Sequence, residues 1–110
     1  MISNLKKDES IKNALQKLSA VYGEENLELA DYWDADLFAI GIENRTDKKH
    51  LIYISTFNLS ADLYFVEVEK ANSETDLMKY EVVECFKSIN FEGLFEVTSK
   101  YLNLQRIYEQ

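Results

Sequence analysis

Two segments with the same helical spacing of apolar residues bracket this chain, and they limit the folds that it can adopt. The first segment carries its stripe at Ile11, Ala14, Leu15, Leu18, Val21 and Tyr22. The second segment has the same relative spacing, with Phe91, Leu94, Phe95, Thr98, Tyr101 and Leu102. Residues three and four apart in sequence share one face of a helix. The spacing therefore predicts an amphipathic helix near each end of the chain.

Capping residues predict where these helices begin and end. Asp8 or Ser10 is a suitable N-cap for the first helix, and Gly23 is a suitable residue to end it. Ser88 or Asn90 would cap the second helix.

The region between the helices is typical of β-strands. Residues 37–44 alternate, with Phe38, Ile40 and Ile42 on one side of the predicted strand. Further strands are expected at 51–57, 63–69 and 78–86, and residues 27–33 are a further strand or an extended approach to the next one. Turn residues fill 44–47 and 58–62, and 71–76 reads as a polar loop.

These elements predict an α+β fold in a single domain over residues 1–110. Short connections favour an antiparallel sheet of four to five strands, with both helices on one face. The helix-facing positions would be Phe38, Ile40, Ile42, Tyr64, Val66 and Val68. The opposite face would carry Ala39, Gly41, Phe65, Glu67 and Glu69, with Tyr53 and Ser55 added by one choice of register. That face is either solvated or a binding surface.

The stretch from Leu18 to Asn44 contains no Lys or Arg. Its acidic residues are Glu24, Glu25, Glu28, Asp31, Asp34, Asp36 and Glu43, and Tyr22, Tyr32 and Trp33 lie among them. Acids mixed with large rings are typical of a surface that binds a cationic partner. The candidate partner-binding residues are therefore Glu24, Glu25, Glu28, Asp31, Tyr32, Trp33, Asp34 and Asp36, together with Glu67 and Glu69. The alternative is that the acids serve only solubility.

The formal net charge of −8, from 20 acidic and 12 basic residues, argues against nucleic acid or an anionic membrane as the direct ligand. No apolar run approaches the roughly 20 residues that span a bilayer, and residues 1–7 lack the apolar core of a signal peptide. A single cysteine excludes an internal disulfide. We therefore expect a soluble cytoplasmic protein.

The residues that could carry chemistry are few. His50 is the only histidine, and Cys85 lies in an apolar strand, where a free thiol is usually buried. Asp34 and Asp36 lack the further ligands and the glycine of a calcium loop. No phosphate-binding loop, zinc motif or redox motif occurs in the sequence. We expect no enzymatic activity, no catalytic or metal-binding residues and no cofactor.

Three segments carry a resemblance to a known family. They are LFAIGIEN at 37–44, LIYISTFN at 51–58 and FEGLF at 91–95. With its small size and acidity, the chain resembles bacterial immunity proteins of contact-dependent growth inhibition and similar polymorphic toxin systems. The resemblance implies a cognate toxin, often a nuclease, that is bound and blocked in the cytosol. It assigns no individual residue to the interface.

Three alternatives stay open. Small acidic secretion chaperones also have helices that flank a block of strands, and they bind an extended effector segment. This chain has no clear middle helix, since the polar tract at 72–76 is too short to supply one. The second alternative is a binding domain of no assigned class, and the third and least favoured is a small enzyme or ligand-binding domain of unknown activity.

Overall fold

The computed structural model describes residues 5–30, 35–71 and 80–107. The chain begins with helix α1 (Glu9–Tyr22), and helix α2 (Phe91–Leu102) follows the sheet. Asp8, rather than Ser10, is the N-cap of α1, and its side chain accepts a hydrogen bond from the Ser10 amide at 3.0 Å. Asn90, rather than Ser88, caps α2 by accepting from the Gly93 amide at 2.9 Å. Both predicted helices are confirmed.

Gly23 ends α1 because the chain turns sharply there. Its φ of 91° lies in the region that residues with a Cβ rarely adopt. A Cβ at this position would also lie 3.0 Å from the Glu25 carboxylate. The turn leads into a short 3-10 helix, η2 (Glu24–Asn26), and then into the sheet.

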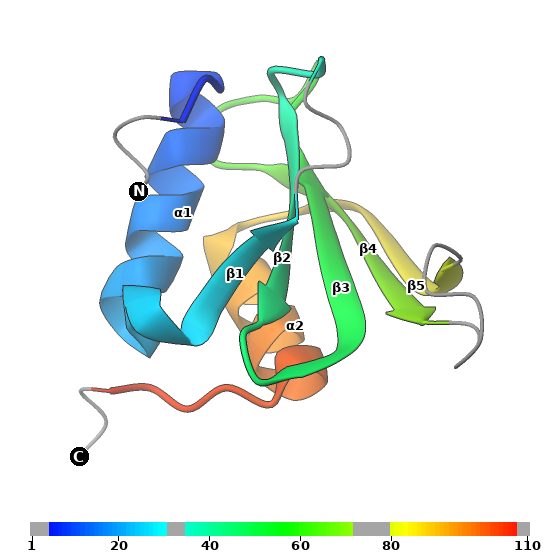
Figure 1. The fold of residues 1–110 in the computed structure, drawn as a ribbon. Coiled ribbons are helices and arrows are strands. Elements are labelled where there is room, and N and C mark those ends of the chain that lie inside the picture. Colours follow the sequence, from blue (N-terminus) through cyan, green and yellow to red (C-terminus); the bar gives the residue numbers. More distant parts are fainter. Residues whose placement is uncertain (1–4, 31–34, 72–79, 108–110) are drawn as a thin grey trace.

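Five strands form one antiparallel sheet in sequence order (Figure 1). They are β1 (Leu27–Ala30), β2 (Ala39–Asn44), β3 (Asp47–Ser55), β4 (Tyr64–Ala71) and β5 (Tyr80–Ile89). The predicted α+β fold and its antiparallel meander are confirmed. The predicted segment 27–33 contains β1, which spans Leu27–Ala30. Residues 31–33 of that segment lie outside the described residues.

Several strand boundaries differ from those predicted. Strand β2 begins at Ala39 rather than Leu37, and β3 ends at Ser55 rather than Phe57. Other strands are longer than predicted, because backbone pairing continues past the end of the apolar pattern. Strand β3 begins at Asp47, where the tight turn from β2 already pairs Asn44 with Asp47. Strand β5 continues to Ile89, which pairs with Tyr64 at the start of β4. Ala71 belongs to β4 rather than to a loop, and the rest of the predicted loop, 72–76, lies outside the described residues.

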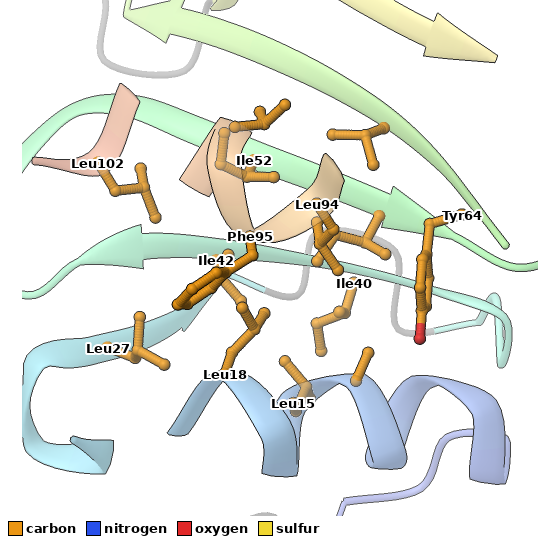
Figure 2. Packing of buried hydrophobic residues seen from close by; sticks show 14 of the residues in the cluster. Leu15, Leu18, Leu27, Ile40, Ile42, Ile52, Tyr64, Leu94, Phe95 and Leu102 are labelled. Atoms are coloured by element: carbon orange, nitrogen blue, oxygen red, sulfur yellow. The ribbon is translucent and has the colours of Figure 1, made fainter. Parts of the chain in front are cut away.

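The hydrophobic core lies between the sheet and the two helices, which cover the same sheet face (Figure 2). Leu15 and Leu18 of α1 and Leu94 and Phe95 of α2 meet the strands there. The strand positions in this core are Ile40, Ile42, Ile52, Ile54, Tyr64, Val66 and Val68. Phe38 contacts Phe57 and lies outside this cluster; the other helix-facing positions predicted from alternation are confirmed.

Polar contacts fix the two helices against each other and against the sheet. The Tyr22 hydroxyl is buried, donates to the Phe95 carbonyl at 3.1 Å and also bonds Ser99. The Asn44 side chain donates to the Leu102 carbonyl at 2.8 Å, which ties β2 to the end of α2. Within the described ranges, neither helix is long and apolar enough to cross a membrane.

Candidate partner-binding face

The sheet face turned away from the helices collects acidic and aromatic side chains. Because successive strand residues point to opposite faces, the residues between the core positions share this second face. Cross-strand pairs place Glu28 beside Glu43, Tyr53 beside Glu67, and Ser55 beside Phe65. We call this surface the acidic face and define it by Glu28, Glu43, Tyr53, Phe65, Glu67, Glu69, Tyr80 and Cys85.

A side-chain hydrogen bond crosses the acidic face. The Tyr80 hydroxyl of β5 donates to the Glu43 carboxylate of β2 at 3.3 Å, although β3 and β4 separate these two strands. Neighbouring strands lie about 4.8 Å apart, so β2 and β5 are about 14 Å apart in a flat sheet. The two long side chains therefore lean toward each other over β3 and β4, and they tie the two ends of the acidic face together.

The floor of the acidic face is buried, and its accessible groups lie on β3 and β4. Leu51 is fully buried, and Glu43 is only 5% exposed. Tyr53, Phe65, Glu67 and Glu69 are half-buried. The edge of Tyr53 meets the ring of Phe65, with centroids 6.2 Å apart. A partner would therefore meet two aromatic rings beside two carboxylates.

Glu67 and Glu69 form a like-charge pair on adjacent outward positions of β4. Burial raises the pKa of Glu69, and the neighbouring Glu67 carboxylate raises it further. Burial also raises the pKa of Glu43, against the opposing effect of the Tyr80 hydrogen bond. Among the described residues, no Lys or Arg lies within salt-bridge distance of Glu67 or Glu69. Within the described part of the chain, the sheet therefore holds the pair without a salt-bridge partner.

Glu28 differs from that pair because two cations approach it. Lys48 on β3 lies 2.7 Å from the Glu28 carboxylate, and Arg45 in the β2–β3 turn lies 3.9 Å from it. The hydrogen bond from Lys48 lowers the pKa of Glu28. The sequence near Glu28 has no positive charge, but the β2–β3 hairpin brings Arg45 and Lys48 next to it in the fold.

The other predicted partner-binding residues fall in different places. Glu24 and Glu25 are exposed on η2, outside the sheet. Asp36 lies just before β2, where its carboxylate accepts a hydrogen bond from the Phe38 amide at 2.9 Å. Burial raises the pKa of Tyr53 on the acidic face, and the negative charge of Asp36 raises it further. Asp31, Tyr32, Trp33 and Asp34 lie outside the described residues.

The candidate chemical groups do not assemble into a site. Cys85 is exposed on the acidic face, so the expectation that it is buried is wrong. The reason is that β5 is an edge strand, with one strand neighbour and no helix over that side of it. His50 lies on the opposite, helix-covered face of the sheet, where its ring centroid is 5.5 Å from that of Tyr101 in α2. The sheet therefore separates the thiol from the imidazole. Over residues 5–30, 35–71 and 80–107, no three His, Cys, Asp or Glu side chains are grouped to hold a metal ion.

Sequence reasoning did not assign Glu43 or Tyr80 to the site. Glu43 lies two and four residues after Gly41 and Ala39, so the period of the strand could have placed it on the same face as these residues. The contact between Glu43 and Tyr80 had no signal in the sequence, because it joins strands that are separated by two others. Comparisons with protein-family models, with curated proteins and with solved structures find no match to this chain.

The crowded carboxylate of Glu69 predicts a pH-dependent effect on stability. An acid whose folded pKa is raised binds its proton more tightly in the folded state. Its unfavourable contribution to stability is therefore present at neutral pH and is relieved as pH falls toward the ordinary glutamate pKa of 4.5. Glu69→Gln should therefore stabilise the protein at about pH 7 and lose this advantage toward about pH 4.5. Urea midpoints at both pH values would measure the change.

The control variant is Glu96→Gln, which removes an exposed carboxylate from α2. Comparing variants at each pH cancels the contributions of His50, Asp8 and Glu28, whose lowered pKa values oppose stability in acid. A Glu69→Gln advantage that is equal at both pH values would show that Glu69 is not strained by its charge.

Proposed function

We propose that this chain is an immunity protein that binds and neutralises a basic toxin domain through its acidic face. The observation that carries the proposal is the Glu67–Glu69 pair, half-exposed beside the rings of Tyr53 and Phe65 and without a salt-bridge partner among the described residues. Aromatic anchors next to charge are enriched where binding energy concentrates in interfaces. A cation from a partner would relieve the repulsion between the two carboxylates, so association is favoured at this place on the sheet.

A nuclease toxin fits this chemistry because it must be cationic where it holds phosphate. An acidic inhibitor can occupy such a groove in place of the nucleic acid. Complementary charge also raises association rates to about 10⁸–10⁹ M⁻¹s⁻¹ at low salt, against about 10⁵–10⁶ M⁻¹s⁻¹ for uncharged pairs. Fast capture suits a protein that must block a toxin before the toxin acts.

Co-expression with the protein encoded immediately upstream tests the proposal. We expect that neighbour to arrest growth when expressed alone, and we expect this chain to restore growth and to copurify with it. A nuclease assay on the purified neighbour, with and without the chain, would name the activity that is blocked. A neighbour that is harmless alone, or that does not bind, would contradict the immunity function.

The edge strand β5 favours a second candidate, a chaperone-like protein that binds an extended segment. Strand β5 lies at the edge of the sheet, and Val82 and Val83 are 51% and 45% exposed. An extended peptide can add to such an edge through backbone hydrogen bonds. Copurification with a harmless, partly unfolded neighbour would support this candidate over the immunity protein.

A further inference from the structure

A hollow of about 520 Å³ opens at the end of the molecule where α1 begins. Three segments meet there: the first turn of α1, the residue before β2, and the β3–β4 loop. We call it the end pocket, and its lining residues include Asp8, Ser10, Phe38, Thr56, Phe57 and Asp62. None of the residues that define the acidic face lines it, so the end pocket is a separate feature of the fold.

Hydrogen bonds between distant parts of the chain hold the end pocket in shape. The Asp8 amide donates to the Leu37 carbonyl at 2.9 Å, and the Thr56 amide donates to the Phe38 carbonyl at 2.9 Å. The hydroxyls of Ser10 and Thr56 lie 2.7 Å apart. Helix, β2 and loop are therefore joined around the hollow, and a ligand would find the pocket already formed.

The charged residues in the lining are all negative. Asp8 and Asp62 both line the end pocket, and the lining contains no Lys, Arg or His. Asp8 accepts hydrogen bonds from the hydroxyl and the amide of Ser10, and these bonds lower its pKa. Its carboxylate is therefore ionised at neutral pH. Such a lining favours a ligand with positive charge and hydrogen-bond donors.

Aromatic rings supply the apolar part of the lining. Phe38 and Phe57 meet edge to face, with centroids 5.9 Å apart. Phe57 is 60% exposed, so its ring is accessible to a ligand in the pocket. Aromatic faces attract a guanidinium group through cation–π contact, and they also pack against the methylene stem that carries it.

We propose that the end pocket binds the side chain of an arginine on a protein partner. The guanidinium would be held between the Asp8 and Asp62 carboxylates, and its stem would pack on Phe57. Arginine fits better than lysine because its planar group has five donors and can both stack on a ring and bond a carboxylate. The inference does not rest on the acidic face, since no residue of that face takes part.

An NMR titration of the full chain tests the proposal without a known partner. The probe is a blocked pentapeptide, acetyl-Gly-Gly-Arg-Gly-Gly-amide, and the control probe has citrulline, which is neutral and nearly isosteric, in place of arginine. We expect saturable amide shifts at Ser10, Thr56 and Phe57 with the arginine peptide and none with the citrulline peptide. The lysine peptide should bind more weakly than the arginine peptide.

Variants that keep the fold locate the site. Asp8→Asn keeps a good helix N-cap, and Asp62→Asn keeps a residue that tolerates the positive φ of 68° found there. Together they should weaken arginine binding at least about tenfold, whereas the Glu92→Gln/Glu96→Gln variant, with the same change in net charge, should not.

Three results would each overturn the proposal. They are equal binding of the arginine and citrulline peptides, equal weakening by the α2 control variant, and binding of free arginine without binding of the peptide. Because the titration contains no toxin and probes no residue of the acidic face, its failure would leave the immunity function standing.

Discussion

Replacing Ile52 by alanine is expected to lower the free energy of unfolding by about 2–5 kcal/mol. Ile52 lies in the central strand β3, is fully buried, and is paired with Ile42 on one side and Val68 on the other. Both neighbours belong to the same core cluster, which the two helices cover. The cavity would therefore open where sheet and helices meet, and backbone pairing on both sides would limit collapse around it.

Urea unfolding followed by circular dichroism measures this loss as a shift of the midpoint at an unchanged slope. The matched control is Val82→Ala, which removes two methyl groups from a side chain that is 51% exposed on the edge strand. The control should change stability by less than about 1 kcal/mol. Equal losses at the two positions would mean that Ile52 does not lie at the centre of the core.

Neutralising the pair on β4, with Glu67→Gln and Glu69→Gln together, is expected to slow association with a basic toxin about tenfold at low salt. This prediction rests on the proposed function. The two carboxylates face the same way from one strand without a cation beside them in the described part of the chain. Glu28 is a poorer choice for this test, because Lys48 and Arg45 already offset its charge.

Stopped-flow association at several salt concentrations would measure the effect. The control variant, Glu92→Gln with Glu96→Gln, removes the same number of charges from exposed positions of α2. The difference between the two variants should shrink as salt rises, because the screening length falls to about 8 Å at 0.15 M. If both variants slow association equally, the rate depends only on net charge. That result would contradict a specific role of the acidic face in attracting the toxin.

Much of the fold could be predicted because its signals are local. The stripes of Ile11 to Tyr22 and Phe91 to Leu102 predict helices, since the turn of a helix alone brings residues three and four apart onto one face. The alternation around Tyr64 to Glu69 likewise separates a core face from an acidic face before any partner strand is known. Gly23 marked the end of α1 through its backbone preference, whereas the start was left between Asp8 and Ser10, and Asp8 caps it through its side chain.

The candidate site depended on pairings that no local pattern encodes. The stretch from Leu18 to Asn44 reads as one acidic surface in the sequence. The structure instead places Glu24 and Glu25 on η2, Glu28 against Lys48, and Asp36 beside the start of β2. Glu43 meets Tyr80 across two intervening strands. Such contacts depend on the strand pairing and the hairpin turns, which the whole packed core determines.

The sequence by itself therefore determined the helices, the order of the strands, and which face of each strand is apolar, because these follow from side-chain periodicity. Only the tertiary structure decided which of the described carboxylates have a cation beside them, as Glu28 has Lys48. The tertiary structure also brings the β3–β4 loop beside the start of α1, where together they line the end pocket. The physical reason is that electrostatic balance and pocket shape depend on distances between residues far apart in the chain.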